Sequence, residues 1–214
     1  MIERKFVASN MNEFMIEEFI SKSIKGAEHS HTKVKRTPLG EKVIIYSARP
    51  GLVVGRKGAN IKQLTKVLKK KFNLENPQIE INEVDKPMLD ARIVAERIAS
   101  TLERFGSNKF KGVGHKTMSD VLASGALGIE ILISGKIPGS RARSWRFYSG
   151  YLKKCGDIAL TGVGKANVYA QLKSGAVGVK VSIMPPDIVL PDTIEIVDKP
   201  EMIIEEVEEV PDEE

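Results

Sequence analysis

The tetrapeptide Gly55–Gly58, with Arg56 and Lys57 between its two glycines, is the segment whose residue types most directly suggest chemistry. Glycine has no Cβ, so a backbone that contains it can approach a phosphate closely. A helix predicted to begin at Ala59 would add free N–H groups and the positive end of its dipole. Lys62 follows within that helix. We predict that this loop binds a nucleic-acid backbone, with a simple turn as the alternative.

A second group of basic residues is interleaved with aromatic ones. It comprises Arg141, Arg143, Arg146, Lys153 and Lys154, among Trp145, Phe147, Tyr148 and Tyr151. On an extended strand, Arg141, Arg143 and Trp145 would share one face, and Arg146 and Tyr148 the other. Arginine beside aromatic residues suits RNA, because phosphate contacts combine with stacking on bases. We expect the arginines to contact RNA, and Trp145 and Phe147 to pack in the core.

A third basic group, Lys109, Lys111 and Lys116 with His115, surrounds a predicted helix start. Helix N-termini attract phosphates, so these lysines are candidates for RNA contacts. Short basic runs are equally often solvated surfaces, and the residues alone do not decide between the two interpretations.

Enzymatic patterns are weak throughout the chain. Residues 159–167 resemble a phosphate-binding P-loop, but Ala159 replaces its first glycine and Ala166 its Ser or Thr. His29 and His31 lack the further ligands of a zinc site and are expected on the surface or facing RNA. Cys155 is expected to be a small packed side chain. We therefore predict no catalytic residues, no metal and no cofactor.

The composition points to a folded protein that binds an anionic partner. The chain has 214 residues, 42% of them hydrophobic and 29% charged, which is not a disordered composition. It has no long apolar run and one cysteine, which argues against membrane, secreted and disulfide-stapled classes. Residues 1–186 hold 32 bases and 16 acids, whereas 187–214 hold one base and twelve acids. A body this basic most commonly binds nucleic acid.

The elements around the GxxG loop have an order that is informative. The sequence predicts a helix from an Asn12 N-cap to Lys25, strands over 29–36 and 41–48, and a short helix before the loop. A helix over 59–72 and a strand over 78–84 follow it. This order matches the KH module in its helix-first, type II arrangement, whose GxxG loop holds single-stranded backbone. We place the KH domain at 16–86, after an N-terminal segment at 1–15.

The second half predicts another α/β domain. A helix at 87–106 connects it to the first, and the domain itself extends over 107–186, before an acidic tail at 187–214. The segments that begin at Gly112 and Gly162 are similar, and both end in a glycine turn and a β-branched run. We interpret them as an internal αβ repeat in two layers. The predicted fold class is therefore α+β.

Three segments together resemble one known family. They are VVGRKGANIKQL, ASGALGIEILISGKIPG and SGAVGVKVSIMPP. The chain is similar to the S-three family, the third protein of the small ribosomal subunit, and best to its archaeal type. The resemblance covers residues 1–186. It implies a cytoplasmic ribosomal protein on the head of the small subunit, which binds ribosomal RNA and neighbouring head proteins.

The resemblance also implies a position at the entrance of the messenger RNA channel, with a part in threading and unwinding the messenger. Bacterial members have paired arginines in the helix before the SGA-x-G turn. In this chain Lys109, Lys111 and Lys116 are the available bases of that region, and the arginine pair is missing. A lysine attracts a strand without arginine's planar fork.

Two other functions remain open at the level of sequence. A free KH protein that regulates single-stranded RNA away from the ribosome would use the same sites. A nucleic-acid lyase, an activity reported for eukaryotic members, would need a lysine of lowered pKa to form a Schiff base, and the sequence singles none out.

Overall fold

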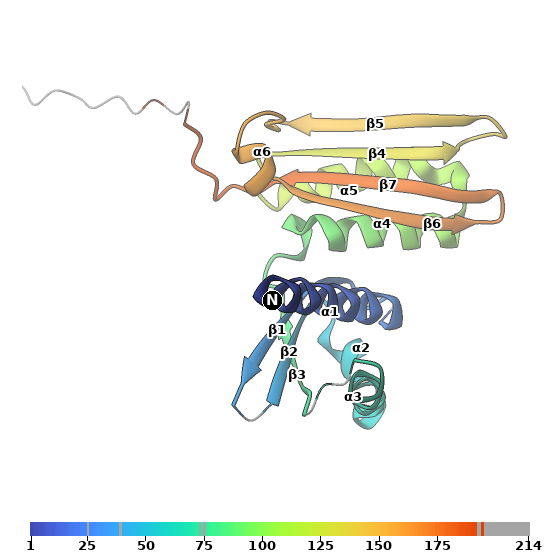
Figure 1. Cartoon of the computed structure of the whole chain (residues 1–214). Coiled ribbons are helices and arrows are strands. Elements are labelled where there is room, and N and C mark those ends of the chain that lie inside the picture. Colours follow the sequence, from blue (N-terminus) through green and yellow to red (C-terminus); the bar gives the residue numbers. More distant parts are fainter. Residues whose placement is uncertain (25, 39, 73, 75, 192–193, 195–214) are drawn as a thin grey trace, which may run out of the picture.

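The computed structural model describes residues 1–24, 26–38, 40–72, 74, 76–191 and 194 and arranges them in two units (Figure 1). Each unit has its own β-sheet and its own apolar core. Most of the acidic tail predicted at 187–214 lies outside the described residues. No helix in the described part of the chain is long and apolar enough to span a membrane.

The first unit packs three helices on one three-stranded sheet. Its elements are α1 (Ile2–Ser23), β1 (His29–Thr37), β2 (Gly40–Ser47), α2 (Pro50–Val54), α3 (Ala59–Lys71) and β3 (Gln78–Glu83). Strands β1 and β2 are antiparallel, and β2 and β3 are parallel. Ile20 of α1 and Leu68 of α3 are fully buried in one cluster with Val43 and Ile45 of β2. The predicted order of elements around the GxxG loop is therefore confirmed.

Helix α1 is longer than predicted. It begins at Ile2, not after an Asn12 cap, and Asn12 lies inside it; Lys25, the predicted last residue, is outside the described part. Asn is a frequent helix cap, but residues 2–11 contain no Gly or Pro that would end a helix before it. Among the described side chains of α1, only Ile16 and Ile20 are buried. The predicted N-terminal segment 1–15 is therefore the exposed first part of α1.

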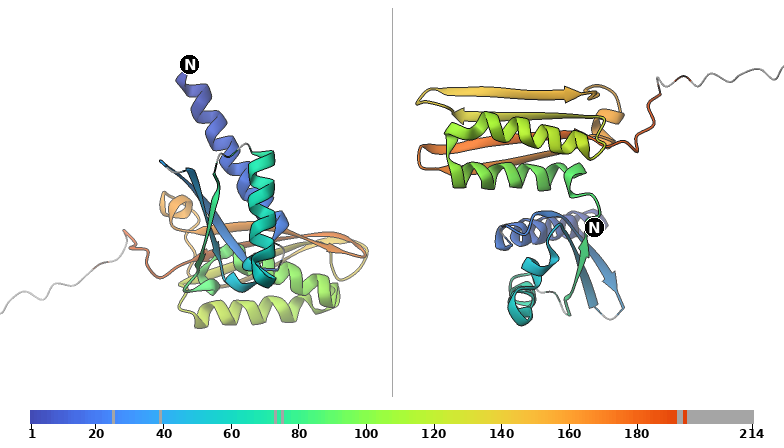
Figure 2. Two further views of the ribbon diagram at one scale, coloured as in Figure 1. Left: turned by 90° about the horizontal axis from the view of Figure 1, so that it is seen from below. Right: turned by 180° about the vertical axis from the view of Figure 1, so that it is seen from behind.

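The second unit has two layers, as predicted. Its elements are α4 (Ala91–Phe105), α5 (Phe110–Ala123), β4 (Gly128–Lys136), β5 (Ala142–Gly150), α6 (Ile158–Thr161), β6 (Gly164–Leu172) and β7 (Gly175–Met184). The sheet has the order β5-β4-β7-β6, and every neighbouring pair is antiparallel. Helices α4 and α5 cover one face of it (Figure 2). The predicted connecting helix thus contributes Val94, Ile98 and Leu102 to the core of this unit.

The internal αβ repeat holds only for its first copy, which forms α5 and β4. The segment from Gly162 forms the hairpin β6–β7 in place of a helix and a strand. In β6, Ala166 and Ala170 are buried and the residues between them are more exposed, which is the alternation of a strand. In α5, Phe110, Gly114, Thr117 and Val121 are buried at helical spacing. The spacing of the apolar positions therefore differs between the two copies, and it determines which copy forms a helix and which forms a strand, despite their similar sequences.

A network of polar residues joins the two units. Asp90 caps α4 by accepting hydrogen bonds from the backbone N–H groups of Arg92 and Ile93, and its carboxylate also accepts the Ser30 hydroxyl. Arg92 pairs with Glu17 of α1 at 2.9 Å. Glu28, which is buried, pairs with Arg97 at 2.7 Å and with Arg49 at 2.9 Å. The network fixes the start of β1 against α4, and therefore the orientation of the first sheet relative to the second.

Candidate nucleic-acid interface

The GxxG loop is a sharp corner between α2 and α3. Gly55 and Gly58 have φ values of 71° and 72°, in the left-handed region that favours glycine. A Cβ on Gly55 would lie 2.6 Å from Nδ2 of Asn60, which itself donates to the Leu52 carbonyl and closes the corner. No side chain in the described residues caps the start of α3. The N–H of Ala59 donates to the Arg56 carbonyl, so the N–H groups that follow it in the first turn of α3 are the ones left for an anion.

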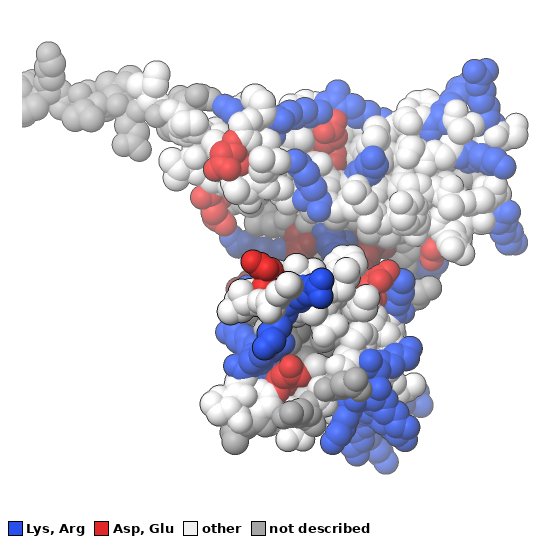
Figure 3. All heavy atoms as spheres, viewed as in Figure 1, with Lys and Arg blue, Asp and Glu red and all other residues white. Residues whose placement is uncertain are grey.

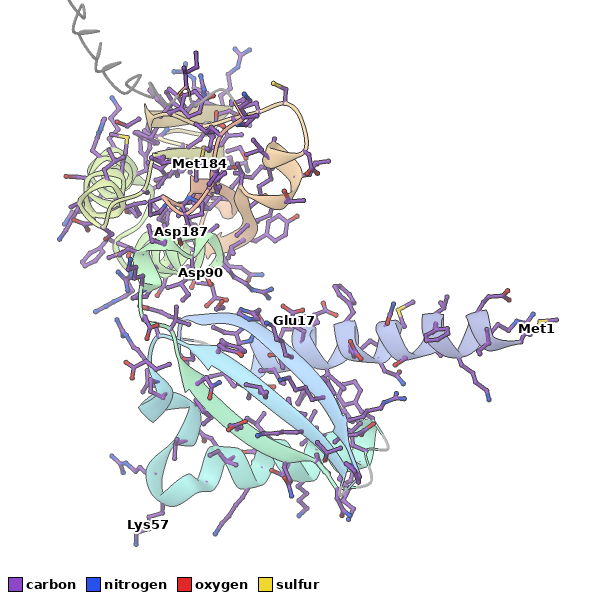
Figure 4. All side chains as sticks on the ribbon, turned by 90° about the vertical axis from the view of Figure 1, so that its left-hand side faces the viewer. Met1, Glu17, Lys57, Asp90, Met184 and Asp187 are labelled. Carbon is purple, nitrogen blue, oxygen red and sulfur yellow. The ribbon has the colours of Figure 1, made fainter. Side chains whose placement is uncertain are left out.

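The charges of this corner point away from the rest of the protein. Arg56 and Lys57 are exposed, and Lys57 lies at the end of the first unit farthest from the second (Figure 4). Lys62 is exposed on α3. The structure also displays Lys66 and Lys69 on the same side of α3, since the three lysines follow at spacings of four and three. Sequence reasoning left these two lysines out, although their spacing was a readable signal.

The three lysines predicted near Gly112 lie around the first turns of α5 and are exposed. Lys109 lies over the ring of Phe105, with its Nζ 5.0 Å from the ring centroid, and Lys111 lies over Trp145 at 5.1 Å. Phe105 is more than half exposed, and Arg104 also contacts its ring. An exposed aromatic ring between cations suits a stacked base, and sequence reasoning missed this residue.

Strand β5 separates the second basic group onto two faces. Phe147 is buried and Trp145 half-buried against the helices, as predicted, so Arg143 lies on the helix side and Arg146 on the open side. Because Lys111 covers Trp145, Lys109 and Lys111 lie at the same end of the unit as Arg141 and Arg143. Figure 3 shows basic side chains gathered at that end. The structure therefore combines two groups that the sequence presents separately.

Arg146, Lys153 and Lys154 lie apart from that end, and an acidic residue neutralises two of them. Glu130 of β4 accepts hydrogen bonds from Arg146 and, at 2.9 Å, from Lys154. Burial alone would raise the pKa of Glu130, but the hydrogen bonds from Lys154 and Arg146 lower it below its ordinary value. Arg146 also lies over the ring of Tyr148, 4.8 Å from its centroid. Lys153 is half-buried.

Removing the charge of Glu130 should strengthen RNA binding. In Glu130→Gln, Arg146 and Lys154 lose their carboxylate partner and become free to contact phosphate. We expect RNA affinity to rise about threefold, because exposed ion pairs of this kind are worth less than about 1 kcal/mol. Fluorescence anisotropy with a labelled single-stranded RNA measures the change. An unchanged or weaker affinity would show that this side of the sheet does not contact RNA.

His29 and Cys155 do not lie where the sequence predicted. His29 is buried, with 1% of its surface exposed, and His31 stacks on Tyr46 with ring centroids 4.3 Å apart. The expected surface position of His29 is therefore wrong, because the start of β1 is covered by α4. Cys155 is exposed and free, not packed. Within the described ranges, no three His, Cys, Asp or Glu side chains come together as metal ligands would.

Comparison with known proteins gives two family matches and a set of full-length relatives. Residues 15–89 match the KH domain, and residues 98–183 match the C-terminal domain of ribosomal protein S3. Small ribosomal subunit protein uS3 of Methanocaldococcus jannaschii is 43% identical over 208 residues, which is 96% of this chain and 99% of that protein. The proteins of the same name from Methanococcus aeolicus and Methanococcus maripaludis are 41% and 44% identical, over 98% and 92% of this chain. They cover 100% and 92% of those proteins.

Proposed function

The chain belongs to the family of small ribosomal subunit protein uS3, and from this membership we propose that it is a structural component of the head of the small subunit. In this proposal it binds ribosomal RNA through both of its units. It works in the cytoplasm as part of the ribosome, by electrostatic and conformational means, without a catalytic step.

The observation that carries the RNA-binding part of this proposal is the GxxG corner. Its cations are exposed and point away from the core, and no side chain of the described residues caps the helix that follows. The two glycines allow the left-handed backbone conformation of the loop. Such a corner binds phosphate through backbone N–H groups and side-chain charge together. The basic end of the second unit, with Arg141 and Arg143, supplies a second contact with ribosomal RNA.

We further assign Lys109, Lys111 and Lys116 to the messenger RNA, at the entrance of its channel. All three are exposed around the start of α5, and Phe105 beside Lys109 adds a stacking surface. Lysines act there as point charges, so they attract a passing strand without holding a fixed geometry. This suits a channel through which the strand must move.

Sucrose-gradient sedimentation of a native lysate, probed for this chain at low and moderate salt, tests the ribosomal assignment. We expect the chain to sediment with small subunits at both salt concentrations, because an RNA contact of many phosphates and protein neighbours survives moderate salt in the assembled particle. A chain found only in light fractions would contradict the assignment and favour a free KH regulator of single-stranded RNA.

The RNA affinity of the purified chain, unlike its association with the assembled subunit, should depend strongly on salt. Its affinity for a single-stranded RNA should fall by about 0.7 log units per log unit of salt for each phosphate contacted. A flat salt dependence would contradict RNA binding by electrostatic contacts.

A further inference from the structure

The first part of α1 is an exposed apolar helix. Seven large apolar residues from this end have exposed side chains: Met1, Ile2, Phe6, Val7, Met11, Phe14 and Met15. Figure 4 shows the helix extending well beyond the sheet of the first unit to Met1. A short helix without a packing partner is marginal in water, and contiguous exposed apolar surface marks an interaction site. Val7, Met11 and Phe14 lie on one side of the helix at spacings of four and three.

This apolar line continues into a groove between the two units. The groove has a volume of about 1130 Å³ and lies between α1, α4 and β6. Phe14 lines it on the α1 side, and Ala99, Val168 and Tyr169 line it on the other. Tyr169 is 76% exposed, although it is a large aromatic residue. We call Val7, Met11, Phe14 and these three residues the α1 docking surface.

The charges that line the groove disfavour RNA as its occupant. Three carboxylates line it, those of Glu18, Glu96 and Glu103. The groove's cations are engaged within the chain: Lys22 pairs with Glu18 at 2.6 Å, Arg92 pairs with Glu17 at 2.9 Å, and Lys165 donates to the Ala159 carbonyl at 2.6 Å. A phosphate backbone would meet three carboxylates and three cations that already have partners in the chain, so the groove has no positive excess to hold it. This surface differs in that respect from the basic body of the chain.

We propose that the α1 docking surface binds an amphipathic helix of a neighbouring small-subunit protein. The apolar side of that helix lies on Met11, Phe14 and Tyr169, and a flanking Lys or Arg residue faces Glu103. A groove lined by apolar side chains with a charged rim is a common way to bind a helix. The proposal rests on the proposed function, because a ribosomal particle supplies RNA and protein as the neighbours, and the carboxylates favour protein.

A photoreactive residue identifies the occupant directly. The full chain, with p-benzoylphenylalanine in place of Met11, is assembled into small subunits from ribosomal RNA and the remaining proteins, and then irradiated. We expect its adduct on a helix of another small-subunit protein. An adduct on ribosomal RNA, an adduct on a second copy of this chain, or no adduct in the assembled particle would each overturn the proposal.

A double substitution tests the energetic contribution of the surface. Met11→Ser with Phe14→Ser changes only exposed side chains, so Ile16 and Ile20 still hold α1 in place. We expect the occupancy of the crosslinked neighbour in reconstituted subunits to fall about tenfold, as for the loss of two interface anchors. Affinity of the free chain for RNA should be unchanged. The matched control is Tyr148→Ser, which removes an exposed aromatic residue from β5, at the sheet edge opposite β6. It should leave the neighbour's occupancy unchanged.

The two proposals fail in different ways. If the wild-type chain neither binds RNA nor enters subunits, the ribosomal function is wrong, and the docking proposal fails with it. If the chain enters subunits and binds RNA normally, but the double substitution leaves every neighbour at full occupancy, only the docking proposal is wrong.

Discussion

The chain with Arg56→Asp and Lys57→Asp should bind single-stranded RNA about 100-fold more weakly than the wild type at low salt. The substitution removes two exposed cations at the tip of the GxxG corner and puts two anions near the phosphates. Each charge-assisted hydrogen bond contributes about 1.5 kcal/mol or more, and the loss of two corresponds to about 100-fold. The slope of log affinity against log salt should also decrease by about 1.4, for two phosphates of a single strand.

The double substitution should leave the fold intact. Lys57 has a φ of 54°, and aspartate tolerates this left-handed conformation better than most residues. Neither residue is buried, and both glycines of the corner are kept. A circular dichroism melt of the variant should therefore match that of the wild type.

A control of equal charge separates local contact from the general field of the protein. Arg4→Asp with Lys5→Asp makes the same change in net charge at exposed positions near the far end of α1. We expect this control to weaken RNA binding only about threefold, because distant exposed charges are screened by salt. If both double variants lose the same affinity, the GxxG corner does not contact RNA, and the basic body binds by its overall charge.

The sequence was sufficient to predict the corner itself. Its glycines, its cations and the order of the elements on either side are all local features, and the structure arranges them as expected. The expected packing of Phe147 and Trp145 against the core is also confirmed, with Phe147 buried and Trp145 half-buried. Local patterns such as these depend on residues a few positions apart, and a single sequence contains them in full.

Other features depend on contacts between distant residues, and these could not be predicted. The second copy of the repeat is a different case: its strand period was readable, but its similarity to the first copy suggested a helix, and it forms β6 beside β7 instead. The neutralisation of Arg146 by Glu130 needs the pairing of β4 with β5. Burial of His29 needs α4 to cover the start of β1, and the contact between Ser30 and Asp90 joins residues 60 positions apart.

This buried histidine should make the stability of the protein depend on pH. Burial, with further contributions from Arg92 and His31, lowers the pKa of His29 to about 4, although Asp90 acts in the opposite direction. Nε2 of the ring lies 2.8 Å from the Thr32 hydroxyl, and Nδ1 is buried without a hydrogen-bond partner among the described residues. The folded protein therefore holds His29 neutral at pH values where the unfolded chain protonates it.

The sign of the effect follows from which state binds the proton. Between pH 6.5 and about 4, the unfolded state binds a proton that the folded state does not, so the free energy of unfolding falls as the pH falls. The contribution of His29 is fully present above pH 6.5. About 3 kcal/mol of it is lost by pH 4, since each pKa unit corresponds to about 1.4 kcal/mol. This loss of stability arises at the junction between β1 and α4, where His29 is buried.

Urea unfolding of the wild type and of His29→Gln, at intervals from pH 7 to pH 4.5, measures this contribution. Glutamine does not titrate in this range, so the free energy of unfolding of the variant should fall less steeply with pH. Burial raises the pKa of Glu96, which gives a slope of the opposite sign, but that slope is common to both proteins and cancels in their difference. Parallel pH profiles would mean that the folded protein protonates His29 as readily as the unfolded chain does, and that the junction opens to water. A difference that grows from pH 6.5 downward would identify His29, at the contact between β1 and α4, as an acid-sensitive group of the fold.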